Sequence, residues 1–296
     1  MTILILGGNG MIGHKMYQTL SQDFDDTWVL IRQDLDILPY KNIFNKKKVI
    51  HSADLTEFDK LTGILNKLNP DVIINAAGIT IRRGIENSIS DSILVNAALP
   101  HLLEEWVTGK VGKRLIQFST DCVFSGKTGL YTEETETDAI DYYGKTKALG
   151  EVKGSQSLTL RGSMIGRELA NHTELLEWFL SRNGKTVKGY SNVIYSGITT
   201  VRMARFVKKI INDFPLLSGL YNVSSIPISK YDLLVLFREA FKLDIQILNE
   251  HNYSSRKDLL SEKYYRETGI DVPAWEDLVK ELKDDSLFYK EYYKTN

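Results

Sequence analysis

The sequence is poor in the features that mark secreted, membrane and nucleic-acid-binding proteins. It has one cysteine, Cys122, in 296 residues, so no disulfide can form within the chain, and a reducing compartment fits this composition. The formal net charge of -1 provides no basic excess for binding nucleic acid. No apolar run approaches the ~20 residues that a membrane-spanning helix needs. We therefore expect a soluble cytoplasmic protein whose partners include neither nucleic acid nor a membrane.

Histidine is also scarce, and its positions do not suggest a metal site. The five histidines are scattered along the chain without the short, regular spacing of metal ligands. We therefore predict no metal site. The hydrophobic fraction of 43% and the charged fraction of 25% are those of a globular protein, with room for one large domain or a large domain with a smaller lobe.

Short apolar runs alternate with longer segments that carry apolar residues at helical spacing. We expect strands at residues 3–6, 28–31, 49–50, 72–75, 115–118 and 158–160, and helices at residues 11–20, 58–68, 93–107 and 142–152. Strands that alternate with helices form right-handed βαβ units, whose parallel strands are covered by helices on both faces. The sequence therefore predicts an α/β fold built on a doubly wound parallel sheet of the Rossmann type.

The pattern changes after about Arg161. We expect an irregular stretch at residues 185–199, helices at 175–180, 200–211 and 230–241, strands at 219–223 and 245–248, and a terminal helical region. The last residues, 287–296, are expected to be a solvated helix end or a disordered terminus. This arrangement predicts a nucleotide-binding domain at residues 1–160 and a smaller α/β substrate-binding lobe at 161–296, with some segments returning to the main domain.

A glycine-rich turn follows the first expected strand and opens the first expected helix. Its glycines, Gly7, Gly10 and Gly13, follow the spacing Gly-x-x-Gly-x-x-Gly, with Asn9, Met11 and Ile12 between them. Glycine allows the tight turn, and the missing side chains let the backbone approach a pyrophosphate at the positive end of the helix. A turn without a ligand would look the same, but the position between strand and helix is the one that dinucleotide binding requires.

Residues after the next three expected strands fit the remaining parts of a dinucleotide. Arg32 ends the second strand and favours the 2′-phosphate of NADP over the ribose hydroxyl of NAD, although nearby Asp34 and Asp36 leave NAD open. Asp54 and Leu55 follow the third strand, where an adenine ring would lie. The small residues after the fourth strand would let the backbone come close to the cofactor; they are Ala76, Ala77 and Gly78.

Tyr143 and Lys147 lie four residues apart in an expected helix, so they share one face. A free phenol has a pKa of about 10, and a nearby cation would lower that pKa toward the working pH. A phenol with such a pKa is an efficient proton donor. Taken alone, the pair is a weak signal, because Tyr-x-x-x-Lys often occurs by chance and usually marks a solvated helix face.

Together these motifs resemble the extended short-chain dehydrogenase/reductase superfamily. Within it the chain is most similar to the dTDP-4-dehydrorhamnose reductase family. The resemblance rests on the glycine turn, Asp54-Leu55, Asn75 to Gly78, Ser119 to Gly126, Tyr143-x-x-x-Lys147 with Gly150-Glu151 behind it, Leu160-Arg161, Ser255 to Asp258, Gly269, and Pro273-x-Trp275. These features follow the expected order over nearly the whole chain.

The resemblance implies that NADPH reduces the 4-keto group of a nucleotide-linked 6-deoxyhexose, in deoxysugar or polysaccharide precursor synthesis. Tyr143 would donate the proton, Lys147 would hold the nicotinamide ribose and keep the phenol acidic, and Thr120 would polarise the carbonyl oxygen. Asn96 would order the active site beside the cofactor. The family often forms dimers, so a homodimer is possible.

The resemblance also places the substrate. Thr80, Thr120, Asp121, Cys122 and Met164 would line the sugar site, and Arg256 would contact the nucleotide phosphates. The chain departs from the family here, because Cys122 and Met164 stand where the family keeps tyrosine and tryptophan. The segment 79–83 is also unlike the common family form. These departures put the usual sugar of the family in question and leave the reduction chemistry intact; Cys122 itself is expected to be an inert thiol.

Other functions remain open on the same motifs. A nucleotide-sugar 4,6-dehydratase needs an Asp-Glu pair after the threonine, and Asp121-Cys122 lacks the glutamate. A C4 epimerase uses the same tyrosine and threonine with tightly held NAD, and Arg32 weighs against it. A non-catalytic binding subunit, like the regulatory β-subunit of methionine adenosyltransferase, would not need Thr120, Tyr143 and Lys147 together.

Overall fold

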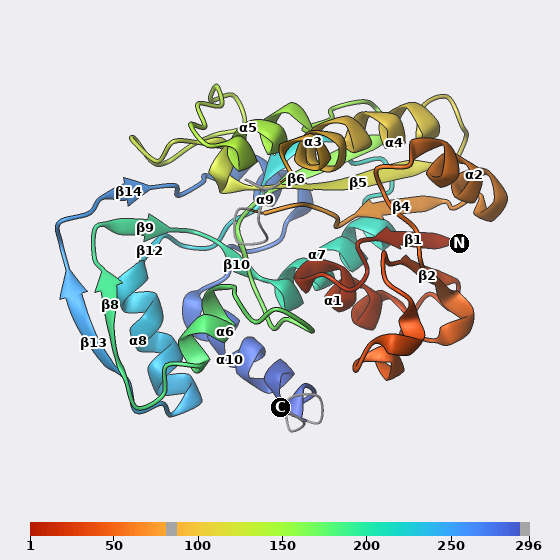
Figure 1. The fold of residues 1–296 in the computed structure, drawn as a ribbon. Helices are drawn as coiled ribbons and strands as arrows, with labels where there is room; N and C mark the ends of the chain where they lie inside the picture. Colours follow the sequence, from red (N-terminus) through yellow and green to blue (C-terminus); the bar gives the residue numbers. More distant parts are fainter. Residues whose placement is uncertain (81–87, 291–296) are drawn as a thin grey trace.

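A parallel sheet of seven strands forms the centre of the computed structural model, which describes residues 1–80 and 88–290 (Figure 1). The strand order is β11-β6-β5-β4-β1-β2-β3, and every neighbouring pair in it is parallel. The strands are β1 (Ile3–Leu6), β2 (Thr27–Leu30), β3 (Val49–Ile50), β4 (Val72–Asn75), β5 (Arg114–Ser119), β6 (Ser157–Arg161) and β11 (Gly219–Asn222). The predicted doubly wound sheet is confirmed.

Both faces of the sheet are buried, which explains why its strands read as continuous apolar runs. In β1, Ile3 and Ile5 face one hydrophobic core and Leu4 and Leu6 face another, because successive side chains of a strand point to opposite faces. Figure 1 shows α2 (Phe58–Leu68), α4 (Leu99–Val107) and α5 (Tyr142–Leu149) on one face and α1 (Met11–Leu20) and α7 (Thr200–Asp213) on the other.

The helix expected at residues 93–107 is longer and less regular than its sequence suggests. It begins as α3 (Ile89–Ser92), continues as the π-helical segment η6 (Ile93–Ala98) and ends as α4. A π-helical turn inside an α-helix often marks a functional position. Here it contains Asn96, one of the predicted site residues.

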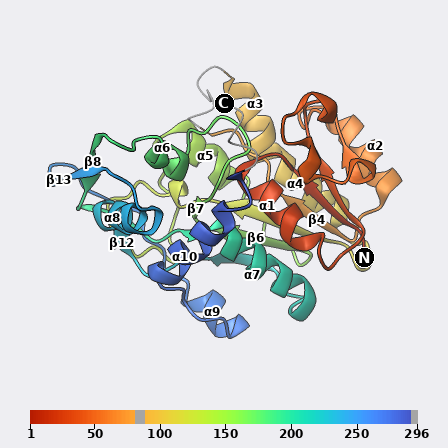
Figure 2. The same cartoon turned by 90° about the horizontal axis from the view of Figure 1, so that it is seen from below.

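The C-terminal half builds a lobe beside the sheet and also returns to it (Figure 2). The strand β11 pairs with β6, and α7 packs against α1. The remaining elements are β7 (Met164–Ile165), α6 (Leu175–Leu180), β8 (Thr186–Tyr190), β9 (Val193–Tyr195), β10 (Ile198–Thr199), β12 (Ile228–Ser229), α8 (Lys230–Phe241), β13 (Gln246–Glu250), β14 (Ser255–Arg256), α9 (Glu262–Thr268) and α10 (Trp275–Ser286). The domain boundary near residue 160 stays a prediction.

The prediction of an irregular stretch at residues 185–199 is wrong, because this segment contains β8, β9 and β10. The strand β8 pairs with β13, which lies about 60 residues further along the chain, and β9 pairs with β12 and β14. These strands are short, and in β8 only Val187 and Gly189 are buried. Their pairing partners are distant in sequence, so local apolar patterning gave little sign of them.

The expectation of a solvated helix end fits the exposed Leu287, Phe288 and Lys290 but is wrong for Tyr289. After α10 the chain turns onto α1, and the side chain of Tyr289 is fully buried there. Residues 291–296 lie outside the described residues.

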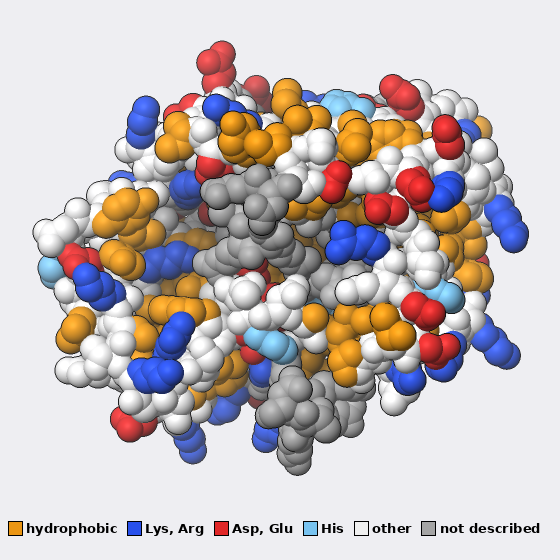
Figure 3. Space-filling view, in the orientation of Figure 1, with side chains coloured by type: hydrophobic (Ala, Val, Ile, Leu, Met, Phe, Trp, Pro, Cys, Tyr) orange, Lys and Arg blue, Asp and Glu red, His pale blue; other side chains and the backbone are white. Residues whose placement is uncertain are grey.

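The surface shows no large field of one charge on the face seen in Figure 3, where basic and acidic side chains are intermixed. None of the helices in the described part of the chain is long and apolar enough to cross a membrane. Among residues 1–80 and 88–290, no three His, Cys, Asp or Glu side chains gather as a metal would require.

A buried ion pair joins Glu151, which follows α5, to Arg161 at the carboxyl end of β6. The guanidinium of Arg161 at the end of β6 makes two bonds to Glu151, Nε to Oε1 at 2.8 Å and Nη2 to Oε2 at 2.6 Å. The two side chains are 2% and 5% exposed, and the hydroxyl of Ser119 donates to the same carboxylate. Loss of one partner would leave an uncompensated charge in the interior.

We expect Glu151→Gln to lower the free energy of unfolding by about 3–5 kcal/mol, the usual result of breaking a buried pair. Urea unfolding measures this change. The matched control is Asp213→Asn, which removes the carboxylate of the half-exposed pair Lys209–Asp213 on α7. It should cost less than about 1 kcal/mol. Equal effects of the two substitutions would contradict the structural importance of the Arg161–Glu151 pair.

Candidate functional site

A cavity of about 620 Å³ opens at the carboxyl ends of β1, β2 and β4. The strand β1 lies between β4 and β2 in the sheet, so the strand order reverses there, and ligands of open α/β sheets bind at such a point. Ten of the predicted cofactor residues line this cavity: Gly7, Asn9, Gly10, Met11, Arg32, Asp54, Leu55, Ala76, Ala77 and Gly78.

The glycine turn brings the backbone of β1 against its own helix and against the neighbouring strand. Gly7 has a φ of +71°, and a Cβ there would lie 2.8 Å from the Cα of Ala77. A Cβ on Gly13 would overlap the carbonyl oxygen of Gly7. Gly13 is therefore needed for the closure of the turn rather than for lining the cavity. Ile12 packs against the main hydrophobic core.

Arg32 and its neighbours form one end of the cavity. Arg32 is exposed and lines the cavity beside Gln33, whose side-chain oxygen accepts a hydrogen bond from Asn9 at 2.8 Å. Asp34 caps a short 3₁₀ turn through the backbone N–H of Asp36, and Asp36 pairs with Lys46. The two acidic residues therefore have partners of their own on the protein surface.

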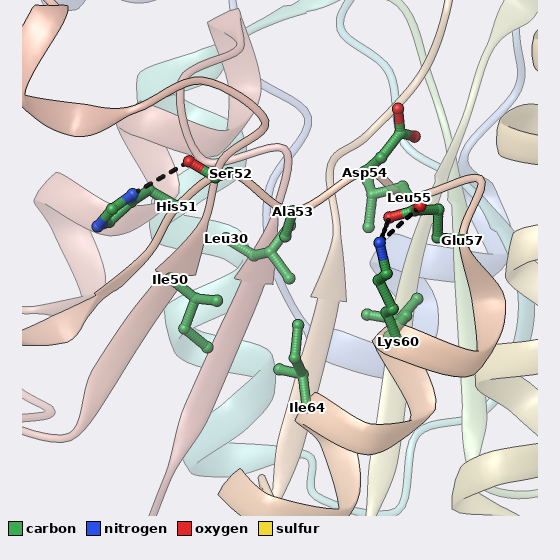
Figure 4. A pocket seen from close by; sticks show the side chains of 11 residues that line it. Leu30, Ile50, His51, Ser52, Ala53, Asp54, Leu55, Glu57, Lys60 and Ile64 are labelled. Atoms are coloured by element: carbon green, nitrogen blue, oxygen red, sulfur yellow. Dashed lines mark hydrogen bonds and ion pairs between the residues drawn. The ribbon is translucent and has the colours of Figure 1, made fainter.

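A smaller cavity of about 130 Å³ adjoins this end (Figure 4). Leu30, Ala53, Asp54 and Leu55 belong to both cavities, and Ile50 and Ile64 add apolar surface. Asp54 accepts hydrogen bonds from the backbone N–H and the hydroxyl of Thr56, and the backbone bond is the main cause of its lowered pKa. The side chains of Leu30, Ile50 and Ile64 form an apolar slot near the carboxylate of Asp54.

Thr120 and Tyr143 meet at the carboxyl end of β5. Thr120 follows Ser119, the last residue of that strand, and its hydroxyl accepts from the backbone N–H of Cys122 at 3.2 Å, so it does cap its own turn. The same hydroxyl donates to Asp121 at 3.2 Å, and it lies close enough to the phenol of Tyr143 to lower the pKa of that group. The structure thus brings the predicted threonine and tyrosine together.

The pKa of Tyr143 is raised above its ordinary value, chiefly because the phenol is removed from water. The nearby Cys122, Asp121 and Glu174 raise it further, and the neighbouring Thr120 opposes them. The expectation that this phenol has a lowered pKa is therefore wrong in this structure. Burial outweighs the effect of Thr120, and the phenol keeps its proton.

Lys147 lies on the same helix but points to the backbone of β5. Its ammonium donates a hydrogen bond to the carbonyl oxygen of Phe118 at 2.7 Å. Burial lowers the pKa of Lys147 to about 8, and the carboxylate of Glu151 partly opposes this. The group therefore remains mainly protonated at neutral pH.

Asn96 joins three segments of the site. Its side chain is fully buried and exchanges two hydrogen bonds with the backbone of Ile79, each 2.9 Å long. Its amide also donates to the hydroxyl of Thr146 on α5 at 3.1 Å. Asn96 therefore fixes the segment after β4 against the helix that carries Tyr143. None of Asn96, Tyr143 and Lys147 is among the residues that line the large cavity.

The predicted sugar-site residues lie in three parts of the fold. Asp121 and Cys122 lie beside the phenol of Tyr143, and burial raises the pKa of the Cys122 thiol to about 12, so this thiol is a poor nucleophile. Thr80 has a buried hydroxyl without a hydrogen-bond partner among the described residues. Met164 belongs to β7 and is partly buried.

Arg256 and the segment 79–83 were also predicted to belong to the substrate site. Arg256 pairs with the buried carboxylate of Asp258, with a 3.2 Å separation between Nη2 and Oδ2. The unusual segment noted at 79–83 can be followed only to Thr80, because residues 81–83 lie outside the described part of the chain.

Sequence reasoning missed several residues of the site. Tyr195 of β9 is buried, and burial is the main cause of its raised pKa, to which the charges of Asp121 and Cys122 add. It brings an aromatic ring to a region where Cys122 and Met164 provide none. The residues from Glu168 to Asn171, together with Thr173, line the large cavity as well. Neither carries a local motif, and Tyr195 lies in the stretch that was expected to be irregular.

The glycine turn yields a direct test. Gly13→Ala should lower the free energy of unfolding by about 1–3 kcal/mol, because its Cβ meets rigid backbone at Gly7. The control is Gly63→Ala in the middle of α2, where a Cβ meets nothing within 4 Å. That change should stabilise the protein by about 0.5–1 kcal/mol. Thermal and urea unfolding of both variants measure the difference, and destabilisation by Gly63→Ala alone would refute the account.

Comparison with known proteins places this architecture in a family. A family model described as the RmlD substrate binding domain matches residues 1–173. A dTDP-4-dehydrorhamnose reductase from Aggregatibacter actinomycetemcomitans is 30% identical over 249 residues, covering 80% of this chain and 79% of that protein. A probable low-salt glycan biosynthesis reductase from Haloferax volcanii is 33% identical over 103 residues, about a third of each chain.

Solved structures share the fold. The crystal structure of dTDP-4-dehydrorhamnose reductase from Bacillus anthracis in complex with NADP superposes with a TM-score of 0.77 at 20% identity, covering 96% of this chain and 99% of that one. The UDP-glucose 4-epimerase of Thermus thermophilus, in complex with NAD, gives 0.76 at 17% identity, covering 96% and 98%. The fold alone does not separate these activities. The family match over residues 1–173 and the relative at 30% identity do assign the sequence: the chain belongs to the dTDP-4-dehydrorhamnose reductase family of extended short-chain dehydrogenases/reductases.

Proposed function

We propose that this protein uses NADPH to reduce the 4-keto group of a nucleotide-linked 6-deoxyhexose. The observation that carries the proposal is the close approach of Thr120 and Tyr143 at the carboxyl end of β5, in a sheet whose switch point opens into a dinucleotide-sized cavity. Family membership supports the same chemistry.

The residues present fit a dinucleotide. The turn at Gly7 leaves no room for a Cβ, so backbone rather than side chain faces the cavity where a pyrophosphate would bind at the start of α1. The apolar slot between Leu30, Ile50 and Ile64 suits an adenine ring. Arg32 offers a cation at the adjoining end, and Asp34 and Asp36 are engaged elsewhere, which favours a 2′-phosphate.

Tyr143 would supply the proton that the reduction requires. The nicotinamide, when bound, would supply a hydride to the carbonyl carbon. Tyr143 would then give its proton to the developing alkoxide, and the product is the alcohol. The raised pKa of Tyr143 keeps the proton on the phenol until it is needed. Thr120 would turn its one hydroxyl proton from Asp121 to the same oxygen and stabilise its negative charge.

Lys147 would serve as a cationic donor to the nicotinamide ribose. Its ammonium is held by the carbonyl of Phe118 and keeps further N–H donors for the sugar hydroxyls. The unpartnered hydroxyl of Thr80 would find its hydrogen bond in the substrate.

The activity is tested by supplying NADPH and a panel of dTDP-, UDP- and GDP-linked 4-keto-6-deoxy sugars. We expect NADPH oxidation with at least one of them, and a product in which NMR shows the new alcohol. Tyr143→Phe should reduce turnover by about 10²–10⁴-fold, because the proton donor is lost, while NADPH binding persists. The control is Tyr142→Phe, which alters the neighbouring tyrosine whose side chain is 55% exposed.

The outcomes separate the alternatives. Full activity of Tyr143→Phe would remove the proposed proton donor. Interconversion of two sugars without net NADPH oxidation would indicate an epimerase. NADPH binding with no turnover of any sugar would favour a non-catalytic binding subunit.

The cofactor preference depends on Arg32. Arg32→Ala should weaken NADPH binding about tenfold or more, because a charge-assisted contact to the 2′-phosphate is lost, and should leave NADH binding nearly unchanged. Fluorescence titration with each cofactor measures both affinities. Arg266→Ala on α9, another exposed arginine, is the control. Equal loss for NADPH and NADH would argue against a 2′-phosphate contact.

A further inference from the structure

A buried histidine connects the glycine turn to the C-terminal end of the chain. His14 lies on α1, one turn after Gly10, and is fully buried. Its Nδ1 is 2.7 Å from the carbonyl oxygen of Gly10, and its Nε2 is 2.7 Å from the hydroxyl of Tyr289. Gly10 begins α1 and lines the cavity, so this contact reaches the turn itself.

The directions of these two hydrogen bonds follow from their chemistry. The carbonyl of Gly10 can only accept, so Nδ1 of His14 must carry the proton. Burial lowers the pKa of His14 to about 3, so the ring is neutral and Nε2 is the acceptor. Tyr289 must therefore donate to His14, since the contact of its hydroxyl with Oε1 of Gln18 is longer, at 3.4 Å. A chain of hydrogen bonds then runs from the Tyr289 hydroxyl through His14 to Gly10.

A second contact holds the same C-terminal segment on α1. The ammonium of Lys15 lies 2.6 Å from the carboxylate of Asp285 and 4.8 Å from the ring centroid of Tyr289. Lys15 is 3% exposed. Figure 2 shows the end of α10 reaching α1 beside the sheet. We call Asp285 and Tyr289 the C-terminal clamp.

The Tyr289 ring also lies near Arg167, which directly precedes another part of the cavity lining. The guanidinium carbon of Arg167 is 5.6 Å from the ring centroid, and Arg167 is held by Glu177 at 2.6 Å. The residues that follow Arg167, from Glu168 to Asn171, line the large cavity. Tyr289 therefore contacts side chains connected to two separate parts of the cavity lining, the glycine turn and the segment after Arg167.

We propose that Tyr289 is a positioning residue for the dinucleotide. Its contacts with His14 and Arg167 hold the glycine turn and the segment after Arg167 in the arrangement that binds the cofactor. The inference rests on the proposed function, because it takes the cavity to be the cofactor site. If the cofactor binds only molecules in which the C-terminal clamp is docked on α1, its apparent affinity is the intrinsic affinity multiplied by the docked fraction. By linkage, cofactor binding must in turn favour docking of the clamp.

Tyr289→Phe tests the proposal, because it removes the donor to His14 and keeps the ring. We expect NADPH to bind about tenfold more weakly, while KM for the keto sugar and kcat at saturating NADPH change less than about twofold. The matched control is Tyr264→Phe. Tyr264 is also fully buried, but its hydroxyl has no hydrogen-bond partner in the described part of the chain, so its removal should leave NADPH affinity unchanged.

Unchanged NADPH affinity in folded Tyr289→Phe would overturn the inference, as would equal losses in both variants. Failure of the wild-type protein to bind NADPH would instead overturn the proposed function, so the two failures are distinguishable.

Hydrogen exchange of the wild-type protein gives a second measurement that needs no variant. Adding NADPH should slow amide exchange at residues 285–290 more than in α9, which lies away from the clamp contacts. Equal slowing of both segments, or none at 285–290, would contradict the proposed coupling.

Discussion

The close contact of backbone with backbone at the glycine turn is the constraint on which the rest of the site depends. Gly13 lies against the carbonyl of Gly7, and Gly7 lies against Ala77 of the neighbouring strand connection. No side chain fits at either place. Because the turn closes so tightly, the start of α1 meets the carboxyl ends of β1 and β4, and the cavity forms at the point where the strand order reverses.

Removal from water shapes the chemistry of the reactive groups. The same burial raises the pKa of Tyr143 and Cys122 and lowers that of Lys147, since it disfavours whichever form carries the charge. The result is a protonated phenol, an unreactive thiol and a lysine that is still mainly charged at neutral pH. In the proposed reaction this is a suitable starting state, because the phenol must give up a proton only when an alkoxide develops.

Elements with strong local patterns were predictable from the sequence. The strands at 3–6, 49–50 and 72–75 and the helices at 11–20 and 58–68 have the expected bounds, because buried parallel strands read as apolar runs and surface helices as periodic ones. Gly7, Gly10 and Arg32 were found from their spacing after strands, and all three line the cavity. The short strands β8, β9 and β10 were missed, since each is defined by pairing with a distant segment.

The sequence by itself determined the sheet and the glycine turn, because these depend on local periodicity and on spacing within one βα unit. The roles proposed for Thr120, Tyr143 and Lys147 came from the resemblance to a family. Only the tertiary structure decided the direction of the Tyr143 pKa shift, the aromatic ring of Tyr195 beside Cys122, and the contact of Tyr289 with His14. Each of these depends on burial or on contact between residues far apart in the chain. His14 and Tyr289 are separated by 275 positions, and only folding brings them within hydrogen-bonding distance.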